Sequence, residues 1–143
     1  MKTLFCLASG VVGSLIAKTF GGWDTNLSTL VIFMILDYVT GLIVAVTGNS
    51  PKSENGSLNS YIGFKGIAKK IIMLILVAAS YRIDLVCNID YIRNMAIIAF
   101  IANETISIVE NAGLMGVPIP KAIKKAIDIL KNKGGESDEK DSK

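Results

Sequence analysis

Four long runs of mainly apolar residues, separated by short polar or glycine-containing segments, dominate the pattern along this chain. They occupy residues 3–20, 27–47, 67–86 and 91–116. An α-helix of about 20 residues reaches across the roughly 30 Å hydrocarbon core of a bilayer. The runs therefore predict membrane helices. A soluble helical bundle is the less favoured reading, because runs of this kind would leave its surface too apolar.

Two of the runs are less well suited to cross a membrane than the other two. Residues 3–20 are short and contain Lys18, so this segment either spans with its lysine reaching the headgroups or lies in the interface. The run 67–86 has charged residues near both ends, and these must also reach the headgroups. We expect an all-α integral membrane protein with three to four transmembrane helices, four being preferred.

The end of the chain differs from the membrane domain, which we assign to residues 1–120. Pro118 and Pro120 stop the fourth helix, because proline cannot continue it. Residues 121–133 predict a short, basic amphipathic helix in the cytoplasm. Residues 134–143 are charged and lack apolar side chains, which predicts a disordered tail.

Lysines gather after the second run and after the fourth, and the positive-inside rule assigns such segments to the cytoplasm. Six of them are expected at the membrane interface: Lys65, Lys69, Lys70, Lys121, Lys124 and Lys125. The C-terminus is then cytoplasmic, and the N-terminus is cytoplasmic as well if all four helices span. The net charge of +3, concentrated at helix ends, suits a membrane flank better than a nucleic-acid groove.

Neither catalysis nor cofactor binding is indicated by the residues of this chain. Histidine is absent, which excludes histidine-based catalysis and histidine metal ligands. Cys6 and Cys87 have no metal-like spacing and form no disulfide framework. We expect no enzyme activity, no cofactor and no metal site. The expected partners are the lipid bilayer and other copies of the chain, with no nucleic acid.

Two acidic residues lie in the middle of apolar runs. Asp37 is the eleventh of the 21 residues of the second run, and Glu104 lies at the middle of the fourth. A charge at that depth is costly unless it is paired or hydrated. The basic residues all lie toward helix ends, so we expect the two carboxyls either to be protonated or to line a water-filled interface.

Other polar and small residues share the helix faces of these two acids. A face about 120° wide on the fourth run carries Asn103, Glu104, Ser107, Glu110 and Asn111. On the second run, four residues share a helix face with Asp37: Thr40, Gly41, Ala45 and Gly48. Small residues let another helix approach closely. These faces predict helix contacts within one bundle, contacts between copies, or a water path, and the sequence leaves the three open.

Four short motifs stand out between residues 23 and 130. They are Leu36-Asp37-Tyr38-Val39-Thr40-Gly41, Ile62-Gly63-Phe64-Lys65-Gly66-Ile67-Ala68-Lys69-Lys70, Asn103-Glu104 with Glu110-Asn111-Ala112-Gly113, and Gly116-Val117-Pro118-Ile119-Pro120. Together and in this order they resemble the bacteriophage holins of the toxin-secretion/phage-lysis type, the clostridial-like phage holins.

The resemblance implies a small phage-encoded protein of the host's cytoplasmic membrane. Such proteins assemble with one another, at a programmed time, into lesions or pores that release an endolysin, or in clostridial relatives a large toxin, without necessarily binding it specifically. The family has no catalytic residues or cofactor. Two other functions remain open: a small ion channel or transporter that uses Asp37 and Glu104, and a membrane adaptor with a basic tail.

Overall fold

The computed structural model describes residues 1–51 and 60–129, and the side chains of all of these except residues 2–6, 8 and 9. Four long helices follow one another: α1 (Lys2–Thr19), α2 (Thr25–Val46), α3 (Ser60–Cys87) and α4 (Ile92–Leu114). Residues 121–129 form a further short helix. The described part of the chain contains no strand, which confirms the all-α fold class. The last residues of the helix expected at 121–133 and the tail at 134–143 lie outside the described residues.

The start of α3 differs most from the sequence expectation. The helix was expected at 67–86, but it begins at Ser60, seven residues earlier. Gly63 and Gly66 face the side chain of Tyr38 on α2, and a Cβ atom on either glycine would lie 3.6–3.8 Å from the nearest atom of that side chain. We attribute the extra helical turns to this packing, because glycine itself disfavours a helix interior.

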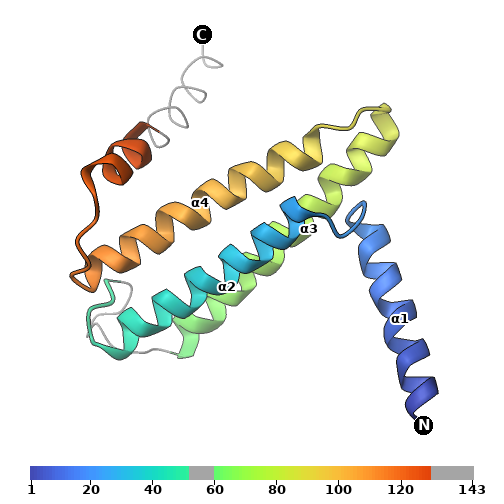
Figure 1. Cartoon of the computed structure of the whole chain (residues 1–143), viewed down its shortest axis with the longest axis horizontal. Helices are drawn as coiled ribbons and strands as arrows, with labels where there is room; N and C mark the ends of the chain where they lie inside the picture. The colour runs from blue at the N-terminus through green and yellow to red at the C-terminus, as the bar shows by residue number, and fades with distance from the viewer. Residues whose placement is uncertain (52–59, 130–143) are drawn as a thin grey trace.

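Three of the helices, α2, α3 and α4, form a bundle in which α3 runs antiparallel to the other two (Figure 1). The helix α4 packs against both neighbours, whereas α2 and α3 contact each other much less. A layer of buried apolar side chains joins the three helices: Leu27, Leu30, Met34, Met73, Val77 and Ile97. This layer occupies the half of the bundle in which α2 begins.

The outer surface of this bundle is also apolar. Large side chains that are at least 40% exposed include Ile32, Ile35 and Leu42 on α2, Ile71, Ile72 and Ile75 on α3, and Met95 and Ile98 on α4. Water disfavours such a surface and lipid accepts it. Helices α2 and α4 are long and apolar enough to cross a membrane, and α3 has exposed charges, Lys69 and Arg82, toward its two ends.

The first helix, α1, projects away from the end of the bundle (Figure 1). It makes only slight contact with the other helices in the described part of the chain. Four of its apolar side chains are 55–68% exposed: Leu7, Val11, Val12 and Leu15. An apolar surface of this kind fits contact with lipid, either across the bilayer or within its interface.

A group of polar residues, which we call the end clamp, closes the bundle where α2 and α4 begin. Asp24 accepts a hydrogen bond from the amide of Leu27 at 2.9 Å and so caps α2. Arg93, which is 6% exposed, donates from Nη1 to Oδ2 of Asp24 at 2.7 Å and from Nη2 to the carbonyl of Gly22 at 3.3 Å. It also donates to the carbonyl of Phe20. One side chain of α4 therefore holds the loop that joins α1 to α2.

Asp84 of α3 completes the end clamp. Its side chain, 4% exposed, accepts hydrogen bonds from the amides of Ile92 at 3.0 Å and Arg93 at 2.9 Å. These amides belong to the first turn of α4 and have no partner within their own helix. A carboxylate of α3 therefore caps α4, and the clamp links the start of α2, the end of α3 and the start of α4.

The end clamp predicts that stability falls in acid. The hydrogen bond from Arg93 lowers the pKa of Asp24 below its ordinary value; burial opposes this effect and the Leu27 amide adds to it. A carboxyl with a lower pKa in the folded state stabilises the fold above its ordinary pKa of about 3.9, and that stabilisation is lost as the pH falls below this value. Because the Asp24 side chain is 46% exposed, we expect a contribution of at most about 1 kcal/mol.

The variant Asp24→Asn isolates this contribution, because asparagine caps a helix about as well as aspartate but carries no charge. In detergent, its thermal unfolding midpoint should lie below that of the wild type at pH 7. The two midpoints should converge as the pH is lowered toward 3. A difference that stays constant over this range would contradict the role given to the Asp24–Arg93 pair.

Candidate functional site

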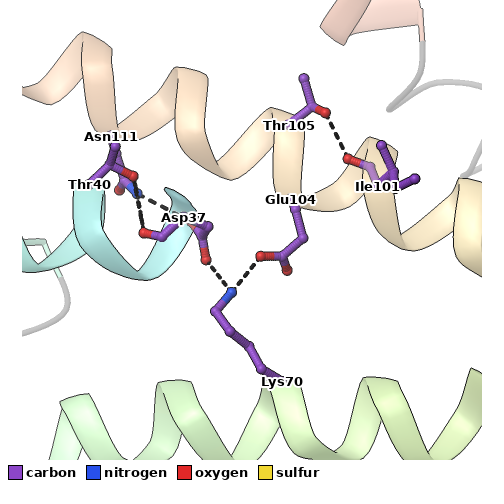
Figure 2. A network of polar contacts seen from close by, with 7 residues as sticks. All are labelled: Asp37, Thr40, Lys70, Ile101, Glu104, Thr105 and Asn111. Atoms are coloured by element: carbon purple, nitrogen blue, oxygen red, sulfur yellow. Dashed lines mark hydrogen bonds and ion pairs between the residues drawn. The ribbon is translucent and has the colours of Figure 1, made fainter. Parts of the chain in front are cut away.

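Next to the apolar layer, side chains from α2, α3 and α4 meet in what we call the ion cluster (Figure 2). The ammonium group of Lys70 donates to Oδ2 of Asp37 at 2.7 Å and to Oε2 of Glu104. The exposed fractions are 14% for Lys70, 16% for Asp37 and 2% for Glu104. Two acids and one base are thus brought together inside the bundle, each from a different helix.

The position of Lys70 corrects two expectations from the sequence. Lys70 was expected at the membrane interface, and neither acid was expected to have a cation at its depth. Because α3 begins at Ser60, Lys70 lies about 15 Å from the start of the helix and faces inward. The ammonium group thus gives both acids a cationic partner that the sequence reasoning did not expect.

The sequence did contain a signal for this inward position. Lys70, Met73, Val77 and Asp84 are spaced at i, i+3, i+7 and i+14, which is one face of a helix. The last three are buried, and Lys70 lies on the same side. The two charged members of this face are the residues through which α3 joins the ion cluster and the end clamp.

Asn111 extends the ion cluster toward the C-terminal end of α4. Its side chain, 7% exposed, donates to Oγ1 of Thr40 at 3.0 Å and to Oδ1 of Asp37 at 3.3 Å. The hydroxyl of Thr40 donates in turn to the carbonyl of Asp37 at 3.0 Å. A Cβ atom on Gly41 would lie 3.6 Å from Nδ2 of Asn111. The polar and small residues around Asp37 therefore contact α4 of the same chain.

The other residues expected on the polar face of α4 lie outside the ion cluster. Asn103 and Glu110 are exposed on one side of the helix, and Ser107 is half-buried. Glu104 and Asn111 face α2 and α3 instead. The polar face expected from the sequence is thus divided between the interior of the bundle and its surface.

Among the small residues expected to pack helices, Gly48 does not lie on a helix. It follows the end of α2 with a φ angle of +75°, and the amide of Asn49 donates to the carbonyl of Val44 at 3.0 Å. This is a glycine C-cap, for which a positive φ is required. Ala45 lies within α2 and is half-buried. Five of the lysines expected at the membrane interface are exposed: Lys65, Lys69, Lys121, Lys124 and Lys125.

The sequence reasoning missed the end clamp. Asp24 had a usable signal, because an aspartate just before an apolar helix is a typical N-cap. Asp84 and Arg93 were interpreted only as charges near helix ends, and their contacts depend on how the helices meet. In the described part of the chain, no group of three or more His, Cys, Asp or Glu side chains is placed to hold a metal ion.

The ion cluster predicts a large penalty for losing its base. Removing one partner of a buried ion pair costs about 3–5 kcal/mol, because the remaining charge is left uncompensated. Lys70→Met should therefore lower the free energy of unfolding by an amount in that range, measured by denaturant titration in mild detergent. The triple variant Lys70→Met/Asp37→Asn/Glu104→Gln should recover much of the loss, because no unpaired charge remains.

Lys69→Met is the matched control, because it removes an exposed ammonium group from the adjacent position of the same helix. Its free energy of unfolding should stay within about 0.5 kcal/mol of the wild type. An equal loss in the Lys69 and Lys70 variants would show that charge on α3 matters in general and not through the ion cluster.

The chain resembles several known proteins over most of its length. The sequence profile of the bacteriophage holin family matches residues 14–132. An uncharacterized protein of Halalkalibacterium halodurans is 39% identical over 138 residues, which cover 92% of this chain and 96% of that protein. A probable holin of Bacillus phage phi105 is 27% identical over 116 residues, which cover 80% and 81%. No solved structure matches the chain. Since the profile spans nearly all of the described bundle, the chain belongs to the bacteriophage holin family.

Proposed function

We propose that this protein acts as a holin in the cytoplasmic membrane of the host bacterium. Copies accumulate as closed bundles and, at a programmed time, assemble into lesions that release an endolysin or a large toxin. The observation that carries this proposal is the ion cluster of Asp37, Lys70 and Glu104, enclosed by three helices whose outer surface is apolar. Membership of the holin family and the relative in phage phi105 support it.

The mechanism follows from where the polar groups lie. In the closed bundle Asp37, Lys70, Glu104 and Asn111 satisfy one another, and the side chains on the outer surface are mainly apolar. A lesion needs the opposite arrangement, with polar faces turned toward water. Separating the helices would hydrate Asp37, Lys70 and Glu104 in place of their mutual pairing. The same side chains thus stabilise two packings of the helices, which is the requirement for a switch between them.

The topology follows from the exposed lysines. Lys65 and Lys69 lie toward the end of the bundle where α3 begins and α4 ends, and Lys121, Lys124 and Lys125 follow α4. The positive-inside rule assigns this end to the cytoplasm and the end clamp to the outer side. The C-terminus is then cytoplasmic. If α1 spans, the protein has four spans and a cytoplasmic N-terminus; if α1 lies in the interface, it has three.

The position of Lys70 argues against a small cation channel. Its ammonium group lies between the two carboxylates, where a permeant cation would have to bind. A membrane adaptor is the other alternative, and the exposed lysines of residues 121–129 fit it. That function leaves the ion cluster without a purpose beyond stability.

Inducible expression in a bacterial host tests the proposal. Membrane potential is followed together with the release of a co-expressed cytoplasmic endolysin. We expect a delay, then an abrupt loss of potential with endolysin release and lysis. A gradual loss of potential with the enzyme retained would favour a channel. An unchanged potential, with the protein present in the membrane, would favour the adaptor.

Glu104→Leu tests the role of the ion cluster in this process. The substitution removes a polar group from the face that turns toward water and makes α4 more apolar, while Lys70 keeps Asp37 as its partner in the closed bundle. Insertion should therefore be retained while lysis is delayed or abolished. Ile75→Leu, a lipid-facing change of similar volume on α3, is the control and should lyse at the wild-type time. Wild-type timing in the Glu104 variant would remove this residue from the mechanism.

A further inference from the structure

Asn103 is a polar residue on the apolar outer surface of the bundle. It is the twelfth of the 23 residues of α4, about 16 Å from either end of the helix. Its side chain is exposed and makes no hydrogen bond within the described part of the chain. An asparagine side chain is too short to reach the headgroups from that depth, in contrast to a lysine. The amide therefore needs a partner from outside the bundle.

The surroundings of Asn103 favour a helix as that partner. Ala96, Ala99 and Asn103 lie within an arc of about 60° on one side of α4, and we call these three residues the α4 flank; Glu110 continues the same arc two turns nearer the C-terminal end of the helix. Ala96 is half-buried and Ala99 is exposed. Small residues at spacings near four allow two helix backbones to approach closely in a membrane. Large side chains, Met95 and Ile98, cover the adjoining surface instead, at 63% and 61% exposure.

We propose that α4 packs through this flank against α4 of a second copy of the chain, with the two Asn103 side chains hydrogen-bonded to each other. A primary amide both donates and accepts, so it is complementary to itself. Copies inserted in the same direction hold Asn103 at the same depth, and a two-fold axis along the membrane normal brings the two amides together. This inference rests on the proposed function and specifies the first contact of its assembly.

The contact leaves the ion cluster undisturbed. Glu104 and Asn111 point toward α2 and α3, while Asn103 lies about 100° around the helix from Glu104. Closed bundles therefore pair without opening. Pairing through Asn103 and rearrangement of Asp37, Lys70 and Glu104 become two separable steps.

Disulfide cross-linking in native membranes tests the contact. In a Cys6→Ser/Cys87→Ser background, Ala99→Cys places a thiol on the flank one turn from Asn103, and Ile98→Cys places one on the adjoining surface as the control. We expect rapid oxidation to a covalent dimer for the first variant and little for the second. Adding Asn103→Leu to the Ala99→Cys chain should weaken association about 5- to 30-fold, measured by energy transfer between labelled copies in liposomes. Asn103→Gln, which keeps the amide, should retain much of it.

Two results would overturn the inference: equal cross-linking at positions 98 and 99, or unchanged association of the Asn103→Leu variant. Labelling of Asn103→Cys by a membrane-impermeant thiol reagent before lysis would do so as well, because the flank would then face water. The lysis assay on the same strains separates this inference from the proposed function. If the wild type lyses normally but the Ala99→Cys variant forms no covalent dimer, the contact is refuted and the holin function is not. Absence of both depolarisation and lysis would refute the holin function whatever the cross-linking shows.

Discussion

One ammonium group joins the three helices of the bundle. Lys70 extends from α3 to a carboxylate on α2 and to another on α4, so moving any one helix away leaves a charge unpaired in a medium of low dielectric. Van der Waals contact alone would allow helices in lipid to slide or exchange partners, because lipid chains are as apolar as the side chains they replace. The ion cluster removes that freedom as long as its three side chains stay paired.

The polar residues that make α3 a poor transmembrane helix are those that attach it to its neighbours. Lys70 and Asp84 would each be costly in lipid, but the first pairs with Asp37 and Glu104 and the second caps α4. Under the proposed function, the membrane placement of α3 would therefore depend on α2 and α4, which are long and apolar enough to cross a membrane. The order of the helices along the chain fits this dependence, because α3 lies between α2 and α4 in the sequence and runs antiparallel to both.

Local signals in the sequence were enough to locate most of the helices. The ends of α2 and α4 lie within two residues of the expected positions, because apolar runs are stopped by glycine or proline close by, as at Gly48 and Gly116. The expected start of α3 was wrong because Tyr38, 22 residues before Ser60, packs on the first turns of this helix. In the sequence, Asp37 and Glu104 stood out only because they lie in the middle of apolar runs. Their shared partner depends on the register between helices, which apolar patterning does not specify.

The bundle separates its polar groups into layers. Leu30, Val77 and Ile97 lie between the ion cluster and the end clamp, so the polar residues that the structure describes form no continuous path along the bundle. Three helices are also too few to surround a passage for a folded enzyme. Under the proposed function, a lesion must therefore be built from many copies side by side. The proposed contact on the outside of α4 would gather copies while each apolar layer stays intact. Under the proposed function, copies would then accumulate without leakage, because opening would require a second event that breaks the pairing around Lys70.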